Sequence, residues 1–219
     1  ARNGRGKLLW PNGSIYEGYW KNNMATGQGR LIQADGTVIV GRFLNNKAHG
    51  HCKCTKADGS VLEGNFVNDS LNGKGLIRFP DGSKYEGEFL NSEPHGKGHI
   101  TWEDGAKYEG EFKYGKKDGK GTMTWEDGRV YQGHWKEDKM HGEGVYSWPE
   151  GKVYRGQYVE DKKQGYGEFS WPDGRFYKGS WVDGKRHGKG VQRSREGIES
   201  EGVWENDKRV RGEGEALPQ

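Results

Sequence analysis

The sequence predicts an all-β protein, an elongated, twisted, single-layer antiparallel strip of about nine β-hairpins. Three observations lead to this prediction. A landmark motif recurs every 23 residues, apolar and charged residues alternate within each repeat, and glycine-containing turn signals separate the alternating segments. Residues 1–214 are expected to form one array of repeats, and residues 215–219 a C-terminal tail.

The repeat is defined by a pentapeptide with glycine at its third position and an aromatic residue at its fifth. Its starts are 23 residues apart without exception, at Tyr16, Ile39, Leu62, Tyr85, Tyr108, Tyr131, Tyr154, Tyr177 and Ser200. Each repeat also has an Asn-Gly, Asp-Gly or Glu-Gly step, and most have a pair of glycines two residues apart. In the last repeat this pair shifts to Gly212 and Gly214, while Gln192 and Ser194 replace apolar residues, so we expect this repeat to cap the array.

A repeat of 23 residues has room for two strands and two connections. In the fourth repeat the expected strands are Gly73–Phe79 and Lys84–Phe89, with a turn at Pro80–Ser83 and a longer loop at Leu90–Gly96. Aromatic residues fall on one face of these strands and charged residues on the other. Because the glycine in the second strand has no side chain, we expect an aromatic ring to lie flat across the strand there.

Composition restricts the classes of function. Hydrophobic residues make up 30% of the chain and charged residues 31%, with 39 glycines, which is too little aliphatic material for a thick core. The net charge of +3 and the nine Trp, eleven Tyr and seven Phe argue against disorder and predict a thin aromatic core. The balance of 35 basic and 32 acidic residues argues against a nucleic-acid partner. Two cysteines imply no disulfide framework and favour a reducing, cytoplasmic compartment.

The motifs resemble those of a known repeat family. The segments YEGEF at Tyr85–Phe89 and Tyr108–Phe112, the Asp-Gly steps, and HGKG at His95–Gly98, all at 23-residue spacing, resemble the MORN (membrane occupation and recognition nexus) repeat. The resemblance implies a β-hairpin array that serves as a binding platform. Such arrays occur in cytoskeletal and ciliary scaffolds, at membrane junctions, and as accessory segments of lipid kinases and lysine methyltransferases.

Two segments come close to a phosphate-binding P-loop, Gly110–Lys117 and Gly179–Arg186. Both lack the Ser or Thr that follows the P-loop lysine, and both begin at the strand glycine of the repeat with no helical pattern behind it. We therefore expect no nucleotide or other cofactor, and no enzymatic activity.

A histidine precedes the glycine pair in every other repeat, and other polar residues take this slot in most of the remaining ones. The histidines are His49, His95, His141 and His187, and the polar residues are Asn3, Asn72, Asp118 and Gln164. We expect these side chains to bond to the turn backbone. Successive histidines would be four strands, roughly 19 Å, apart, which is too far to share a metal ion or a proton.

The densest group of metal-ligand types is His49, His51, Cys52 and Cys54, and zinc held between two molecules is one interpretation. However, Cys54 takes a slot that is aliphatic in other repeats, and Cys52 replaces a glycine on the same face. Small buried thiols explain both cysteines, so we expect no metal site.

Lysines recur along one expected edge of the strip, at Lys116, Lys139, Lys162, Lys185 and Lys208. Spaced about 10 Å apart, they could contact anionic phospholipid headgroups. Acidic residues such as Asp138, Glu160 and Asp161 share the same segments and would cancel much of this field. A solvated edge is therefore the preferred interpretation.

The aromatic face is the expected partner-binding groove, formed by Trp102, Tyr108, Trp125, Tyr131, Trp148, Tyr154, Trp171 and Tyr177. A single layer has no second layer to cover this face, and exposed aromatic residues suit a partner helix or extended peptide. The preferred function is a non-enzymatic scaffold that docks a partner protein in a cytoskeletal or ciliary assembly. The alternatives are a phosphoinositide adaptor at the inner face of a membrane and the regulatory module of a larger enzyme, and two copies could also dimerise through an array end.

Overall fold

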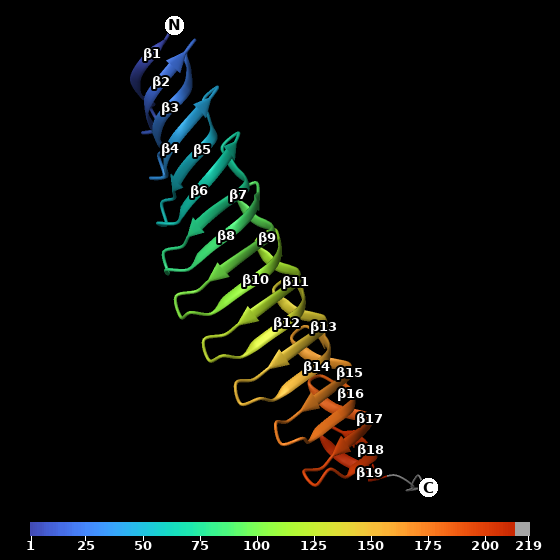
Figure 1. Ribbon diagram of the computed structural model, residues 1–219. Coiled ribbons are helices and arrows are strands. Elements are labelled where there is room, and N and C mark those ends of the chain that lie inside the picture. Colours follow the sequence, from blue (N-terminus) through green and yellow to red (C-terminus); the bar gives the residue numbers. More distant parts are fainter. Residues whose placement is uncertain (213–219) are drawn as a thin grey trace. The chain divides into compact units, whose positions relative to one another are not determined.

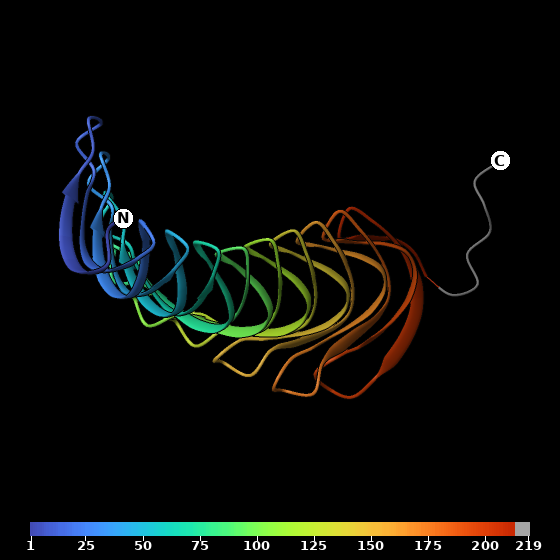
Figure 2. The ribbon, with the colours of Figure 1, turned by 90° about the horizontal axis from the view of Figure 1, so that it is seen from above.

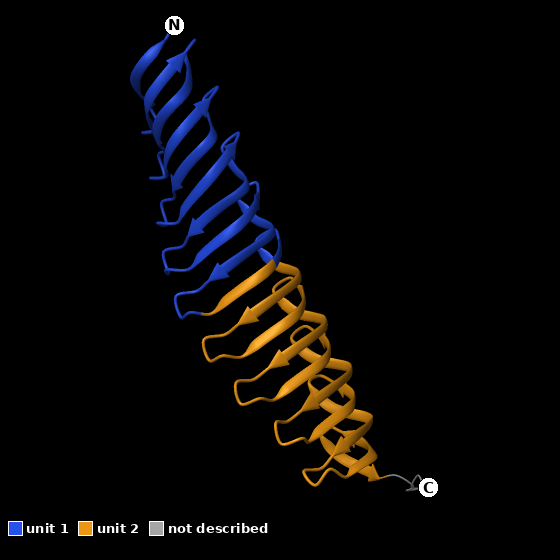
Figure 3. Cartoon of the chain, viewed as in Figure 1, with its two compact units in different colours: residues 1–105, 111–116 blue, residues 106–110, 117–219 orange. Residues whose placement is uncertain are grey.

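The computed structural model describes residues 1–212, which form nineteen strands and no helix (Figure 1). Two compact units are present, residues 1–105 with 111–116, and residues 106–110 with 117 onward (Figure 3). Each unit is an open antiparallel sheet in which every strand pairs with the next along the chain. The predicted all-β strip of hairpin repeats is confirmed. Gly214 and the predicted tail at 215–219 lie outside the described residues.

The first unit contains nine complete strands, in which Gly4 pairs with Trp20 at one end and Tyr85 pairs with Ile100 at the other. The strands are β1 (Gly4–Leu9), β2 (Ile15–Lys21), β3 (Met24–Ile32), β4 (Val38–Leu44), β5 (Lys47–Thr55), β6 (Val61–Val67), β7 (Ser70–Arg78), β8 (Lys84–Leu90) and β9 (Glu93–Thr101).

The second unit contains eight further complete strands and all of a ninth except its first residue, Lys116, and β10 (Lys107–Lys113) is divided between the two units. Figure 2 shows that the strands of this unit, yellow to red, are bent rather than flat. They are β11 (Lys116–Thr124), β12 (Val130–Lys136), β13 (Lys139–Ser147), β14 (Val153–Val159), β15 (Lys162–Ser170), β16 (Phe176–Val182), β17 (Lys185–Arg193), β18 (Glu199–Glu205) and β19 (Lys208–Gly212).

The Asp-Gly step forms the turn that the sequence predicts. Between β11 and β12 the Trp125 N–H donates to Arg129 O at 2.9 Å, and the Gly128 N–H donates to Trp125 O at 3.0 Å. Gly128 has φ of +84°, a conformation that glycine adopts without steric cost. The same pair of backbone bonds closes the corresponding turn in seven other hairpins, and in the hairpin with Trp102 the Gly105 N–H donates to Trp102 O at 3.0 Å.

The prediction of a longer loop at Leu90–Gly96 is wrong. The connection is a two-residue turn, Asn91-Ser92, with φ of +51° and +67°, and Glu93 already begins β9. Two successive residues at positive φ form the turn whose twist matches that of the flanking strands, so no longer loop is needed. The predicted edge lysines therefore begin strands β11, β13, β15, β17 and β19 rather than lying in loops.

The two glycines of each pair have different structural roles. Gly142 has φ of +63° and lies where the register between β12 and β13 shifts in a β-bulge. Gly144 lies beneath the ring of Tyr131, and a Cβ there would be 2.4 Å from that ring. The Tyr131 hydroxyl donates to His134 O at 2.9 Å. The predicted aromatic ring is present, but it lies over the second glycine of the pair rather than over the pentapeptide glycine, because at Gly133 only the Tyr131 hydroxyl comes close.

The degenerate second and third repeats support this role for the ring. Where Ile39 replaces the tyrosine, Cys52, which is paired across the strands with Gly41, takes the place of the second glycine. Where Leu62 replaces the tyrosine, the methyl groups of Leu71 fill the space above Gly75. A side chain at the second glycine is therefore compatible with the fold only where no ring covers it.

The core is centred on two buried columns, which are the first and fifth residues of the pentapeptide, and other buried residues such as Leu71, Met123 and Tyr146 add to it. Tyr131 and Trp135 are typical, with ring centroids 5.1 Å apart and planes at 90°. Similar edge-to-face contacts join each tyrosine to the aromatic residue of the next repeat, as between Tyr131 and Tyr158 at 5.3 Å. Such contacts contribute about 0.5–1.5 kcal/mol each beyond the buried area. Successive hairpins are thus held together by rings rather than by a second layer.

Each two-residue turn also docks on the preceding hairpin. The Asp138 N–H donates to Lys117 O at 2.9 Å, and the Asp138 carboxylate accepts the Lys117 N–H at 2.9 Å. Asn46, Asp69, Ser92, Asp161 and Asp207 make the same pair of bonds with the strand one repeat earlier. Where that strand residue is Pro94, which has no N–H, the turn residue is Gly115, which has no acceptor side chain.

The polar side chain that precedes the glycine pair accepts a hydrogen bond from the first residue of a two-residue turn. Asn72 and Asp118 accept the N–H groups of Asn91 and Glu137, at 3.0 and 3.3 Å. Asn3, His95 and Gln164 do the same. The predicted bond to turn backbone is confirmed for these five side chains, although the turn belongs to the following hairpin. The prediction fails at His49, whose buried Nδ1 has no partner.

Candidate partner-binding surface

The eight residues predicted to form the groove divide into two groups. Tyr108, Tyr131, Tyr154 and Tyr177 are core residues, each with at most 1% of its surface exposed. Burial raises the pKa of Tyr131, Tyr154 and Tyr177, to about 12 for Tyr177. Trp102, Trp125, Trp148 and Trp171 are partly exposed. Any surface offered to a partner therefore consists of the tryptophans, and the tyrosines support it from beneath.

Trp125, Trp148 and Trp171, which we call the tryptophan ladder, occupy the same position in three successive hairpins of the second unit. Tyr146 lies between the first two indoles, at centroid distances of 5.3 and 4.4 Å. Phe169 lies between the second and third, at 5.5 and 4.5 Å. The ladder and the two intervening residues thus form a continuous row of five aromatic rings.

Indole N–H groups distinguish the ladder from the core tryptophans. In the core, Trp135 and Trp181 donate to Gly121 O and Gly167 O, at 3.3 and 3.1 Å. The ladder indoles donate to no group within residues 1–212, and His49 Nδ1 is the one buried side-chain nitrogen or oxygen in that range without a partner. Each ladder nitrogen is therefore an unpaired donor that is not fully buried.

A lysine lies among the rings beside the ladder. Lys163 Nζ is 5.7 Å from the ring centroid of Trp148, 5.1 Å from Tyr154, 4.6 Å from Phe169 and 4.7 Å from Trp181. Burial lowers the pKa of Lys163 to about 8, whereas the ring quadrupoles favour its charged form. Arg129 and Arg175 lie over the outer two ladder indoles, each 5.3 Å from a ring centroid. Every ladder indole thus has a cation nearby.

The lysines predicted to contact lipid lie at the starts of their strands and are partly neutralised. Lys139 Nζ is 3.5 Å from the Glu160 carboxylate, and Lys162 Nζ is 3.2 Å from the Asp183 carboxylate. Lys116, Lys185 and Lys208 are exposed. No helix among the described residues is long and apolar enough to cross a membrane.

The residues weighed as a zinc site are not brought together. Cys52 and Cys54 are buried, and burial raises the pKa of both thiols. His51 points to the opposite face, where its Nε2 is 3.7 Å from Glu63, because neighbouring residues of a strand face opposite ways. Within residues 1–212, no group of three or more potential metal ligands occurs. The P-loop-like segments lie in strands and turns of the hairpins, and no helix follows them in the described chain.

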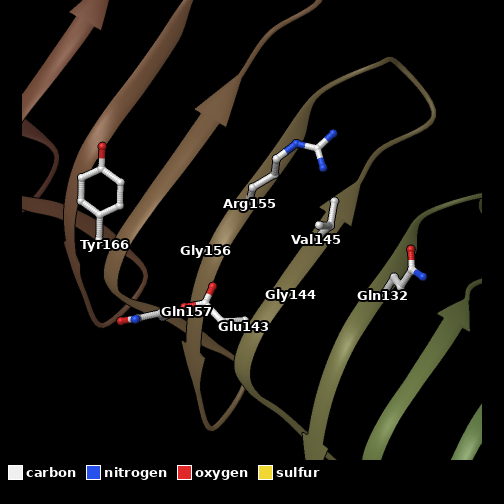
Figure 4. A pocket seen from close by; sticks show the side chains of 8 residues that line it. All are labelled: Gln132, Glu143, Gly144, Val145, Arg155, Gly156, Gln157 and Tyr166. Atoms are coloured by element: carbon white, nitrogen blue, oxygen red, sulfur yellow. The ribbon is translucent and has the colours of Figure 1, made fainter.

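The opposite face of the second unit carries a shallow pocket of about 440 Å³ (Figure 4). Gly144 and Gly156 leave its floor without side chains, and Arg155, Gln157 and the 63%-exposed Tyr166 stand around it. Gln132, Glu143 and Val145 complete the lining. Glu143 and Arg155 in this lining carry opposite charges, and the polar groups of the pocket do not converge on one point.

Sequence reasoning missed Tyr146, Phe169 and Lys163. The two rings occupy a strand slot that holds Leu8 in the first repeat and Ile77 in the fourth, so a change from aliphatic to aromatic residues in this slot was the available signal. The position of Lys163 shares a face with the core rings, because it is paired across the strands with Tyr158. The sequence did not predict this pairing, because the segment that contains Lys163 was expected to be a loop.

Several solved structures resemble the fold. The TCP10 domain of CPAP from Danio rerio matches with a TM-score of 0.50 and 15% identity, over 94% of this chain and 98% of that chain. A point mutant of that domain matches over the same shares of both chains, with a TM-score of 0.50 and 14% identity. The SAS-4 (dCPAP) TCP domain of Drosophila melanogaster, in complex with a proline-rich motif of Ana2 (dSTIL), has a TM-score of 0.40 and 11% identity over 80% of this chain and 88% of that chain. At 15% and 14% identity, the likeness to the two Danio rerio structures is one of fold.

No curated protein sequence matches the chain. The family model for the MORN repeat matches nine segments, at residues 1–15, 16–38, 40–61, 63–84, 85–107, 108–128, 131–153, 154–174 and 177–198. Because these segments cover most of its length, the chain belongs to the MORN repeat family.

Proposed function

We propose that this protein is a non-enzymatic scaffold whose tryptophan ladder docks a segment of a partner protein. The observation that carries the proposal is that the fold does not require tryptophan in this slot. Gln33 and Lys56 occupy it in the second and third repeats, and their turns keep the same backbone hydrogen bonds, at 2.8 Å to Thr37 O and Ser60 O. Three successive indoles therefore need another explanation.

Partner binding supplies that explanation. Partly exposed aromatic rings in a row provide apolar area, and tryptophan is enriched at the centres of protein interfaces. The unpaired indole donors can fix the position of a bound main chain, because each can donate one hydrogen bond. A cytoskeletal or ciliary assembly is the setting that we propose, in line with the use of MORN arrays as platforms in such structures.

Selection from a phage-displayed library of random peptides tests the proposal without a known partner. Peptides enriched on the full chain should bind it in solution and should lose at least tenfold in affinity when Trp148 is changed to Gln, the residue that the second repeat carries in this slot. Trp10→Gln is the matched control, because Trp10 occupies the same slot in the first unit and the next repeat has Gln33 there. Enriched peptides that bind the Trp148→Gln and Trp125→Gln proteins as tightly as the parent protein would contradict the proposal.

A further inference from the structure

We propose that the segment bound by the tryptophan ladder is a proline-rich chain in the polyproline II conformation, lying along the ladder with every third residue facing an indole. This inference rests on the proposed function and specifies the chemistry of the partner. It follows from three properties of the ladder, namely its spacing, its unpaired donors and its cations.

The spacing of the indoles matches the period of polyproline II. Because Tyr146 and Phe169 bridge successive indoles, neighbouring members of the ladder are no more than about 10 Å apart, as expected for a step of two strands at about 4.8 Å each. Polyproline II has three residues per turn and rises 3.1 Å per residue, or about 9.3 Å per turn. Every third residue of such a segment therefore returns to the same face at nearly the same interval as the indoles.

An α-helix fits this spacing less well. Seven residues of helix rise about 10.5 Å, which exceeds the step between indoles, and the mismatch would grow to almost 2 Å over the three positions of the ladder. A heptad also drifts by about 20° around a straight helix, so its third contact would turn away from the surface. For polyproline II the accumulated mismatch is about 0.6 Å, without any drift.

The unpaired donors favour the same occupant. A helix uses its carbonyl groups internally, whereas polyproline II makes no internal hydrogen bonds and keeps its carbonyl groups available. The indole N–H groups of Trp125, Trp148 and Trp171 are not fully buried and have no partner within residues 1–212. Aromatic-lined grooves that bind proline-rich segments use this combination of ring contact and hydrogen bonding.

The charges around the ladder define the segment further. Arg129, Lys163 and Arg175 lie 5.3, 5.7 and 5.3 Å from the three ladder indoles. The two arginines are paired with the aspartates of their own turns, at 2.7 and 2.9 Å, while Lys163 is in no ion pair within the described residues. An uncharged or acidic proline-rich segment is therefore favoured over a basic one.

Labelled peptides of about twelve residues test this inference by fluorescence anisotropy with the full chain. One peptide repeats Leu-Pro-Pro, and a second repeats Leu-Pro-Pro-Pro and so breaks the three-residue period. A third is helical and is lengthened to about fifteen residues, so that a leucine at every seventh residue can reach all three indoles. A fourth is the first peptide with arginine replacing leucine. The Leu-Pro-Pro peptide should bind most tightly. Its affinity should fall about three- to tenfold in Trp148→Phe, which keeps a ring but removes the donor, and it should be unchanged in Trp10→Phe.

The Phe variants should fold, because Phe79 occupies the same slot naturally and its turn keeps the 2.9 Å bond to Ser83 O. If the helical peptide binds more tightly than Leu-Pro-Pro in a manner that depends on Trp148, the inference is wrong while the proposed docking function stands. If Leu-Pro-Pro shows no binding at millimolar concentration, or binds both Trp148→Phe and the parent equally, the inference is also wrong, and the phage selection then decides the proposed function independently.

Discussion

Replacing Gly144 with alanine should destabilise the second unit through the ring of Tyr131. A Cβ at this position would be 2.4 Å from both the ring carbon Cε2 and the hydroxyl oxygen of Tyr131, whereas real Cβ contacts essentially never fall below 3.0 Å. Tyr131 has 0% of its surface exposed and is packed edge-to-face against Trp135 and Tyr158, so the ring cannot simply swing away.

The expected cost can be worked out from these contacts. Overpacking a close-packed site costs about 1–3 kcal/mol, and displacing the Tyr131 hydroxyl from His134 O removes a hydrogen bond that contributes about 1 kcal/mol. Alanine in place of glycine in a strand offsets roughly 0.5–1 kcal/mol of this. The net loss should be about 2–3 kcal/mol, which corresponds to a decrease of about 1–2 M in the urea midpoint for a typical small-domain slope.

The second repeat supplies the control, since Ile39 there coexists with Cys52 in place of the second glycine. Tyr131→Ile alone should cost about 3 kcal/mol because a large ring is lost. The Tyr131→Ile/Gly144→Ala double variant should cost no more than Tyr131→Ile alone, so that the two changes are coupled by about 2 kcal/mol. Urea titrations followed by far-UV circular dichroism measure all three proteins. Additive effects of the two substitutions would refute the role assigned to the ring.

Three further outcomes are expected. Asp161→Gly removes the carboxylate that accepts the Met140 N–H at 2.8 Å while keeping a residue that tolerates positive φ. The free energy of unfolding in urea should therefore fall by about 1 kcal/mol. A loss near zero would contradict the docking of turns on preceding hairpins. Burial lowers the pKa of Lys163 to about 8. The unfolded chain therefore retains this proton to higher pH than the folded chain. As a result, the free energy of unfolding should rise from pH 8 to about pH 10. Lys163→Met, which copies Met140, should remove most of that rise, and urea midpoints that increase equally in both proteins would exclude Lys163 as its source. Because Lys139 and Lys162 pair with carboxylates of the following turns, vesicles with anionic phospholipid should fail to float the protein, and salt-sensitive flotation would favour the lipid alternative.

Most of the fold followed from the repeat because turn chemistry and strand alternation agree at each Asp-Gly step. Gly128 is one example, since its Asp-Gly signal predicts both the turn and the positive φ that is found. The two-residue turns were harder to predict. Asn22-Asn23 has suitable chemistry for positive φ, but Glu137 and Glu160 adopt φ of +47° without such a preference. The next residues, Asp138 and Asp161, dock these turns on the preceding hairpin, and this tertiary contact is not visible in the local sequence.

The candidate site was predicted only in part. The alternation along a strand identifies the face on which a side chain lies, but it does not show how deeply that side chain is buried. Tyr154 and Trp171 were assigned to the same face, yet the tyrosine lies over paired glycines at the centre of the strands and is buried. Trp171 precedes a turn at the end of its strand, so it is partly covered. A correct register for Lys163 would also have required the two-residue turn before β15.

Nine copies of one hairpin within a single chain act as natural variants that separate what the fold needs from what it permits. The fifth residue of the pentapeptide is always a large aromatic residue, because in every repeat it is buried between hairpins. The turn slot, in contrast, accepts Gln33, Lys56, Phe79 and Ser194 with unchanged backbone bonds. The backbone of the turn therefore does not require the four consecutive tryptophans in that slot, Trp102, Trp125, Trp148 and Trp171. The ligand that we propose, whose contacts repeat at the same interval, fits the spacing, the unpaired donors and the partial exposure of the tryptophan ladder.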